Sequence, residues 1–316
     1  MASAPSRIVI ATRQSALALW QAEHVKARLE SLYPGLEVSL LGMTTEGDRR
    51  LGSSLAKIGG KGLFVKELEA ALMSGEADLA VHSMKDVPVN LPDGFVIAAI
   101  GVREDPRDAF VSVHHASPEA LPLGAVVGTS SLRREAQLRA RLPGLRVQPL
   151  RGNVQTRLRK LDEGEYHGVI LASAGLKRLG LEARITSLLS LEQSIPAVGQ
   201  GAIGIETRAG REDLAALLAP LNHGETAWCV YAERSLSRRL LGSCTTPLAG
   251  FARIEAGEAR ISALVATPDG LRVARTEQRA PWSAGGAQAL GEAAAAALER
   301  DGAREILASL EAGGGA

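Results

Sequence analysis

Short apolar segments alternate with longer amphipathic ones along the first two-thirds of the chain. The predicted strands are 7–12, 37–43 and 77–83, and the predicted helices are 16–32 and 63–73, with a Gly- and Lys-containing loop at 47–62. Strands that alternate with helices are typical of parallel sheets with crossover connections. The pattern therefore predicts an α/β fold.

A second copy of this pattern follows the first. Its predicted strands are 125–128, 145–150 and 168–172, and its predicted helices are 131–142 and 153–162. The closest echo is a Gly-Glu pair ahead of a strand, at Gly75-Glu76 and again at Gly164-Glu165. One such match can arise by chance, so it indicates only a weak internal duplication. Two segments, 101–107 and 195–201, are candidate crossings between the halves, which would give hinged lobes with a cleft between them.

The last third of the chain follows a different pattern. A helix is predicted at 225–240, with Trp228, Ala232, Leu236 and Leu240 on one face and with Gly242 as a helix C-cap. Strands are predicted at 248–254, 258–266 and 271–277, the last two joined by a Pro268-Asp269-Gly270 turn, and a final helix at 287–310. These elements predict a small antiparallel sheet with helices packed against it.

Composition narrows the class of protein. With 316 residues, of which 46% are hydrophobic and 22% charged, the chain can form two or three domains. It has no apolar stretch of the roughly 18 residues that a membrane span needs, and its early apolar run, 8–11, is too short for a signal-peptide core. Two cysteines do not make a disulfide scaffold. We expect a cytoplasmic protein with reduced thiols.

Polar motifs follow the predicted strands at their carboxyl ends, where open α/β sheets bind ligands. They are Thr12-Arg13-Gln14-Ser15, Met84-Lys85-Asp86, Thr129-Ser130-Ser131-Leu132-Arg133-Arg134, Arg151-Gly152-Asn153 with Arg157, and Ser173-Ala174-Gly175 with Lys177-Arg178. Helix N-termini attract anions, and arginine binds carboxylate or phosphate through two hydrogen bonds. Ser and Thr are also ordinary helix caps. Their repetition at equivalent strand ends favours a site for a ligand with several acid groups.

Positive charge is concentrated at 131–160, which holds nine basic residues and one acid, Glu135, so its local net charge is 9 − 1 = +8. A solvated helix face is the usual reason for such a run, and nucleic-acid binding is a second. Aromatic residues make up only 3% of the chain, and the arginines follow several strand ends instead of one recognition helix. The pattern therefore argues against a nucleic-acid-binding protein. A steep fall of nucleic-acid affinity with salt would support that alternative.

Two further residues have candidate chemistry. Asp86 is an acid beside Lys85 at a strand end, where it can hold a cation, act as a general acid or base, or form a structural ion pair. Cys244 lies on a loop past a predicted helix end, whereas Cys229 lies inside the helix and is interpreted as a core residue. The six histidines show no metal-ligand spacing.

Long motifs across the chain resemble the porphobilinogen deaminase (hydroxymethylbilane synthase) family. Besides the strand-end motifs above, they are Gly59-Gly60-Lys61-Gly62-Leu63-Phe64, Val81-His82-Ser83-Met84-Lys85-Asp86-Val87-Pro88, Arg103-Glu104-Asp105-Pro106-Arg107-Asp108, Arg151-Gly152-Asn153-Val154 and Pro196-Ala197-Val198-Gly199-Gln200-Gly201. The resemblance implies two periplasmic-binding-protein-like (type II) α/β lobes with a hinge, 1–101 plus 202–219 and 107–195. It also implies a C-terminal α+β domain, 224–316, with a three-stranded antiparallel sheet.

The same resemblance implies a transferase of porphyrin and haem biosynthesis. It would join four porphobilinogen molecules, with loss of ammonia, on a dipyrromethane cofactor attached to Cys244 by a thioether, and release hydroxymethylbilane by hydrolysis. Asp86 matches the family's catalytic carboxylate. The matching cofactor-binding residues are Ser83, Lys85, Asp86, Ser131, Arg133, Arg134, Arg157 and Arg178; the matching substrate-binding residues are Arg13, Ser15, Lys57, Lys61, Arg151 and Arg157. The expected state is a monomer without metal, nucleic acid or membrane partner.

A binding module is the main rival from another class of protein. A two-lobed protein that captures a small anion without chemistry would explain the lobes and the arginines. It would leave Asp86 and the loop cysteine, Cys244, unexplained, and such proteins are commonly exported. Many family members carry Gly where this chain has Ser243, which alters the φ/ψ freedom of the loop before the cysteine.

Overall fold

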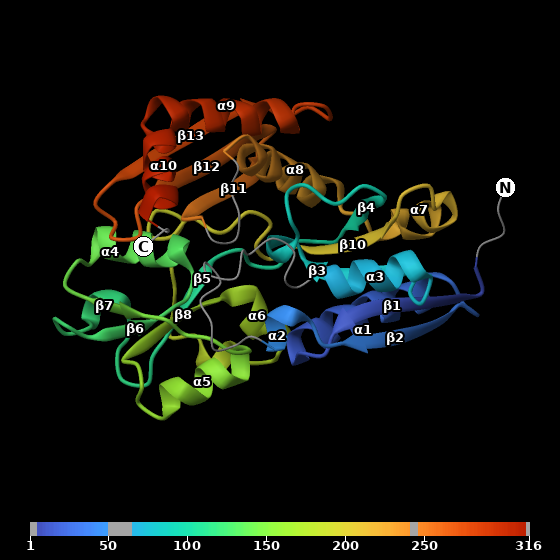
Figure 1. Cartoon of the computed structure of the whole chain (residues 1–316), viewed down its shortest axis with the longest axis horizontal. Helices are drawn as coiled ribbons and strands as arrows, with labels where there is room; N and C mark the ends of the chain where they lie inside the picture. The colour runs from blue at the N-terminus through green and yellow to red at the C-terminus, as the bar shows by residue number, and fades with distance from the viewer. Residues whose placement is uncertain (1–4, 50–64, 241–245, 314–316) are drawn as a thin grey trace. The chain divides into compact units, whose positions relative to one another are not determined.

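The computed structural model describes residues 5–49, 65–240 and 246–313 (Figure 1). The chain divides into two compact units, Met1–Glu104 with Gly201–Ala227 and Asp105–Gln200 with Trp228–Ala316. Two of the passages between units, at 104/105 and 200/201, lie within the crossing segments expected from the sequence. The three-domain division with its hinge stays a prediction.

The first unit contains a mixed five-stranded sheet. Its order is β2 (Glu37–Met43), β1 (Arg7–Arg13), β3 (Leu79–Ser83), β10 (Ile203–Arg208) and β4 (Phe95–Ile100). The first strand is parallel to β2 and β3, as predicted, but β10 is antiparallel to both of its neighbours. The sequence pattern did not predict β4 or β10. The expectation of a parallel sheet therefore fails at this edge, where β10 pairs antiparallel with β3 and β4.

Helices cover both faces of this sheet. On one face, α1 (Ala16–Leu32) and α7 (Glu212–Leu218) bury aliphatic side chains such as Leu29 and Leu214 against the strands. On the other face, α3 (Lys66–Ser74) buries Leu68 and Leu72. A short helix, α2 (Glu46–Arg49), lies at the start of the segment predicted as a loop. Removal of this apolar area from water stabilises the unit.

The second unit repeats this sheet order. Its order is β7 (Arg146–Gln148), β6 (Val126–Gly128), β8 (Gly168–Ala172), β5 (Asp108–Val111) and β9 (Ser187–Leu188), covered by α4 (Leu132–Arg141), α5 (Val154–Asp162) and α6 (Ser173–Arg178). In both sheets the fourth strand is the antiparallel one. Gly75 and Gly164, ahead of β3 and β8, both have φ of 80°. The two glycines of the matching Gly-Glu pairs thus have the same φ in both copies.

A three-stranded antiparallel sheet completes the second unit. It consists of β11 (Leu248–Glu255), β12 (Glu258–Ala266) and β13 (Val273–Pro281). On one of its faces lie α8 (Gly224–Arg239), α9 (Ala287–Arg300) and α10 (Ala303–Gly313), and α4 contacts the other (Figure 1). Cys229 is buried in this core, as predicted.

The single final helix predicted at 287–310 was wrong. The structure has two helices there: the first ends at Arg300, and Gly302, with φ of +88°, separates it from the second. A positive φ is favourable for glycine and cannot continue an α-helix. The predicted turn at 268–270 is present, with Gly270 N–H donating to the Thr267 carbonyl at 2.9 Å.

The predicted fold class is confirmed by these elements: two α/β sheets of one strand order and a separate three-stranded antiparallel sheet. None of the helices in the described ranges is long and apolar enough to cross a membrane.

Candidate active site

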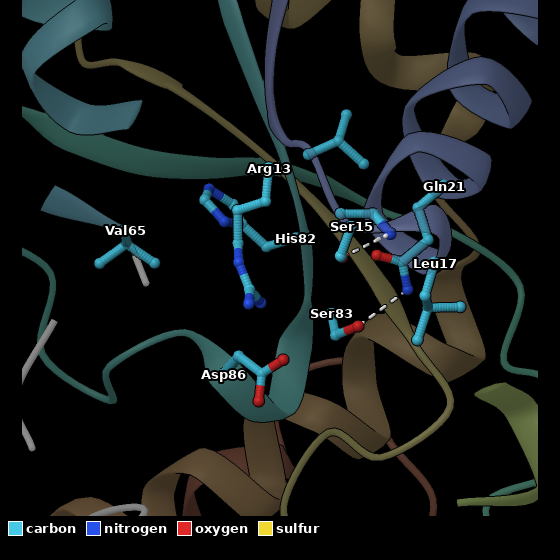
Figure 2. A pocket seen from close by; sticks show the side chains of 10 residues that line it. Arg13, Ser15, Leu17, Gln21, Val65, His82, Ser83 and Asp86 are labelled. Carbon is cyan, nitrogen blue, oxygen red and sulfur yellow. Dashed lines mark hydrogen bonds between the residues drawn. The ribbon is translucent and has the colours of Figure 1, made fainter. Parts of the chain in front are cut away.

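Four of the predicted site residues line one recess in the first unit. Arg13, Ser15, Ser83 and Asp86 surround it, together with Gln21 and His82, which the sequence analysis did not select. In Figure 2 the side chain of Arg13 extends toward Asp86, and both residues line the recess. Its volume, about 50 Å³, accommodates a few water molecules or one polar group of a ligand.

Local structure places the predicted residues of the recess at or just after strand ends. The first strand, β1, ends at Arg13, and the Ser15 hydroxyl then caps α1 by accepting a hydrogen bond from Ala18 N–H at 3.3 Å. After β3 the chain makes one 3₁₀ turn, Met84–Asp86, which carries Lys85 and Asp86. The buried Met84 anchors this turn, since its N–H donates to the Ala202 carbonyl at 3.0 Å. The strand-end prediction thus holds for this half of the site.

Gln21 is a residue that sequence reasoning missed. Its Nε2 donates to the Ser83 hydroxyl at 2.8 Å, and its side chain is only 2% exposed (Figure 2). A signal was present in the sequence: Gln21 is polar, yet it sits beside the apolar stripe of α1 that includes Ala18, Ala22 and Val25. A buried amide needs hydrogen-bond partners, so such a position indicates a polar neighbour.

His82, which lines the recess, is one of three buried ionisable side chains in the first unit. His82 on β3 makes a 2.8 Å contact from Nε2 to Oε2 of Glu206 on β10, and both side chains are buried. Glu69 on α3 is buried as well. Burial and the neighbouring Glu206 charge raise the pKa of Glu69, although His82 and Lys66 oppose part of this rise. Glu69 therefore binds a proton more tightly than an ordinary glutamate.

In the second unit, the strand ends carry helix caps and arginines. Ser131 caps α4, and its hydroxyl accepts from Arg134 N–H at 3.5 Å. Arg157 lies in α5, where its Nε donates to the Gly152 carbonyl at 2.8 Å. Burial lowers the pKa of Arg151, and Arg178 is buried at the end of α6. These positions agree with the predicted placement beyond strand ends.

Arg133 and Arg134 are engaged with a carboxylate that the sequence analysis did not select, Asp108. Arg133 Nη1 and Arg134 Nη2 each lie 2.8 Å from an Asp108 oxygen, and all three side chains are buried. Burial would raise the pKa of Asp108, but the two guanidinium charges and their hydrogen bonds outweigh it and hold that pKa well below its usual range. Asp108 is therefore ionised, and the cluster carries one excess positive charge.

The remaining predicted residues fall into two groups. Lys85 is half-buried on the Met84–Asp86 turn and is not among the residues lining the recess. Lys57, Lys61 and Cys244 lie outside the described residues. Within the described part of the chain, no group of three His, Cys, Asp or Glu side chains could hold a metal ion.

The fold and site define the class of protein: an α/β protein with an ionisable recess on one sheet and arginine-rich strand ends on another. Family models match most of the chain: "Porphobilinogen deaminase, dipyromethane cofactor binding domain" at 8–216 and "Porphobilinogen deaminase, C-terminal domain" at 227–300. The chain belongs to the porphobilinogen deaminase family, whose members are transferases.

Individual relatives are similar over nearly their whole length. The chain is 60% identical to the porphobilinogen deaminase of Chromobacterium violaceum over 304 residues, which is 96% of this chain and 98% of that one. It is 60% identical to that of Ralstonia nicotianae over 313 residues, 98% of this chain and 94% of the other.

Solved structures with a similar backbone have low identity. The methionine binding protein MetQ matches at a TM-score of 0.46 and 15% identity, covering 71% of this chain and 93% of that one. Immunogenic lipoprotein A from Vibrio vulnificus matches at a TM-score of 0.43 and 15% identity, covering 70% and 96%.

Proposed function

We propose that this chain catalyses the stepwise condensation of four porphobilinogen molecules and releases hydroxymethylbilane, a linear tetrapyrrole of porphyrin and haem biosynthesis. The family assignment over nearly the whole chain supports this reaction. The observation that carries the assignment to a site is the recess that Arg13 and Asp86 both line. A carboxylate beside a guanidinium suits a substrate that carries both an ammonium group and carboxylates.

Within this proposal, Asp86 is the catalytic carboxylate and Arg13 holds a substrate carboxylate. Each condensation removes the substrate's amino group as ammonia and passes through positive charge on the pyrrole. The Asp86 side chain stabilises that charge, while Ser15 and Ser83 supply hydrogen bonds at the edge of the recess. Lys57, Lys61, Arg151 and Arg157 complete the proposed substrate-binding set.

The proposed cofactor is a dipyrromethane joined to Cys244 by a thioether. When bound, it supplies the pyrrole carbon to which the first substrate is joined. The second unit fits a ligand of this charge: the Asp108 cluster carries one excess positive charge, and Arg133 Nε is buried without a hydrogen-bond partner among the described residues. Ser83, Lys85, Asp86, Ser131, Arg133, Arg134, Arg157 and Arg178 are the proposed cofactor-binding residues.

The proposed setting is that of a cytoplasmic monomer that binds neither nucleic acid nor membrane. Acids of the protein itself, Asp108, Glu119, Glu163 and Glu165, pair with much of the +8 charge of 131–160, so the proposal needs no nucleic-acid partner to explain it. Division of the chain into two α/β lobes, 1–101 plus 202–219 and 107–195, and a cofactor domain, 224–316, belongs to the same proposal.

The test is the intact mass of the denatured protein, compared with that of Cys244→Ser. We expect a mass excess equal to one dipyrromethane in the parent chain and none in the variant. Cys229→Ala is the matched control, because Cys229 is buried in the helical core and should not affect the adduct.

Parent chain and Cys229→Ala should also convert porphobilinogen to hydroxymethylbilane, whereas Cys244→Ser should not. Full activity of Cys244→Ser, or an adduct that survives this substitution, would remove the cysteine from the proposal. If the parent chain gained no adduct after incubation with porphobilinogen, the binding-module alternative would replace the enzyme.

A further inference from the structure

Two side chains bind successive carbonyls of the loop between β7 and α5. The Tyr166 hydroxyl donates to the Pro149 carbonyl at 2.7 Å, and the Ser130 hydroxyl donates to the Leu150 carbonyl at 2.9 Å. Arg151 is the next residue of the loop. Neither Tyr166 nor Ser130 has a role in the proposed function, although both hold the backbone from which Arg151 extends.

The ring of Tyr166 also packs on the end of β6. A Cβ atom at Gly128, the last residue of that strand, would lie 2.8 Å from Cδ1 of Tyr166 and 3.1 Å from Cδ2 of Leu150. Tyr166 is buried in the same apolar cluster as Leu150 and Leu158. Burial, together with the charge of Glu165, raises the pKa of Tyr166, so its hydroxyl keeps the proton that it donates. One side chain therefore fixes the backbone at the ends of two parallel strands, β6 and β7.

The carbonyls of this loop matter for an anionic ligand. An ionised carboxylate only accepts hydrogen bonds, so a carbonyl oxygen turned toward it would repel it. Tyr166 and Ser130 engage two of the loop's carbonyls, and Arg157 Nε donates to a third, that of Gly152, at 2.8 Å. Donors from the protein itself thus bind these acceptors.

Arg151 is the charged group that this backbone carries. It is half-buried, and none of the described residues forms an ion pair with it. Burial lowers the pKa of Arg151, and no acid opposes this shift. A guanidinium in such surroundings is stabilised by a carboxylate that arrives with a ligand. The place at which it meets that carboxylate depends on the backbone that Tyr166 and Ser130 hold.

We propose that Tyr166 and Ser130 are positioning residues that hold the guanidinium of Arg151 in place for a carboxylate of the substrate. This inference rests on the proposed function, in which Arg151 binds porphobilinogen. Both side chains act through backbone carbonyls and not by contact with the substrate. Their loss should therefore weaken substrate binding and leave the chemical step intact.

The kinetic test compares Tyr166→Phe with the matched control Tyr33→Phe. The Tyr33 hydroxyl also donates to a backbone carbonyl, that of Leu217 at 2.9 Å, but in the first unit. Each substitution removes one hydroxyl and keeps the ring, so both variants should show a similar fall in the urea midpoint. We expect only Tyr166→Phe to raise KM for porphobilinogen, about fivefold, the equivalent of one neutral hydrogen bond, with kcat within about twofold of the parent.

The second hydroxyl is tested in the same way. Ser130→Ala should also raise KM about fivefold, because the Leu150 carbonyl loses its donor. Its control is Ser74→Ala in α3, where the hydroxyl donates to the Ala71 carbonyl at 3.2 Å. Values of KM in Tyr166→Phe and Ser130→Ala equal to those of their controls would overturn the proposal.

Arg151→Lys distinguishes positioning from a general loss of structure. Lysine keeps the charge but cannot form two parallel hydrogen bonds to a carboxylate, so KM should rise in this variant alone. Tyr166→Phe should then add little in the Arg151→Lys chain, because the group that it positions is already gone. A full fivefold effect in that chain, or a fall in kcat at unchanged KM, would overturn the proposal. Failure of the proposed function would appear separately, as absence of the cofactor mass adduct from the parent chain.

Discussion

Arg133 and Asp108 form a two-pronged ion pair in the interior of the second unit. Nη1 of Arg133 donates to Oδ2 of Asp108 at 2.8 Å, and Nη2 donates to Oδ1 at 3.2 Å. Arg134 adds two further hydrogen bonds to Oδ1, at 2.8 and 3.0 Å. One carboxylate at the start of β5 therefore fixes both arginines at the N-terminal end of α4.

Replacement of Asp108 by asparagine is expected to destabilise the protein strongly. Asp108→Asn leaves two buried guanidinium groups without a counter-charge, and breaking a buried pair in this way costs about 3–5 kcal/mol. The measurement is the free energy of urea unfolding. The matched control is Asp162→Asn, which breaks an exposed ion pair with Arg184 and should cost about 1 kcal/mol or less. Equal losses in the two variants would show that the Asp108 cluster adds no special stability.

Glu69 predicts a pH dependence of stability. Its pKa is raised in the folded chain, so its contribution is fully present below the ordinary glutamate pKa of about 4.3 and is lost as pH rises toward the folded value. Glu69→Gln keeps a neutral side chain at every pH. We expect its free energy of unfolding, relative to that of the parent, to improve as the pH rises above the ordinary glutamate pKa. A difference that stays constant as the pH rises would mean that Glu69 has no raised pKa.

The sequence pattern missed two strands, β10 and β5, for the same physical reason: each contains a buried acidic residue. Glu206 interrupts the apolar pattern of β10, and Asp108 opens β5, so neither segment resembles a buried strand. Both side chains are buried beside partners distant in sequence: His82 contacts Glu206, and the α4 arginines form ion pairs with Asp108. Local pattern cannot reveal such pairing. Segments with no buried charge were predicted well: α1 and β2 have the predicted bounds.

The residues of the candidate site also divide into those that the sequence predicts and those that it does not. Its strand-end residues, including Arg13 and Asp86, could be predicted because parallel strands bring their carboxyl ends to one edge. The residues that support them, Gln21 and Glu206, come from the interior of a helix and from an antiparallel strand. Their positions follow from tertiary packing, which one sequence does not display.

Gly204 is expected to matter for the turn that carries Asp86. A Cβ atom at this position of β10 would overlap Sδ of Met84, with Cγ of Met84 at 3.2 Å. Met84 is fully buried, so Gly204→Ala should cost about 1–3 kcal/mol of stability through overpacking and should lower kcat by displacing the Met84–Asp86 turn.

The control for this substitution is Gly224→Ala, since a Cβ there meets no atom within 4 Å. Thermal unfolding and kcat should both distinguish the two variants. If Gly204→Ala were destabilised but kept the kcat of the parent, packing at Met84 would not determine the position of Asp86.

Loss of the hydrogen bond between Gln21 and Ser83 is expected to lower stability and to weaken ligand binding. Gln21→Met keeps the length of the side chain but removes the donor that faces the Ser83 hydroxyl. The net value of such a bond is about 1 kcal/mol, equivalent to roughly a fivefold rise in KM if Ser83 is misoriented toward its ligand. A double-mutant cycle with Ser83→Ala isolates this bond, and the coupling energy should be about 1 kcal/mol. Gln288→Met, on the exposed face of α9, controls for the loss of an amide. Additive effects of Gln21→Met and Ser83→Ala would mean that Gln21 only fills space beneath the recess.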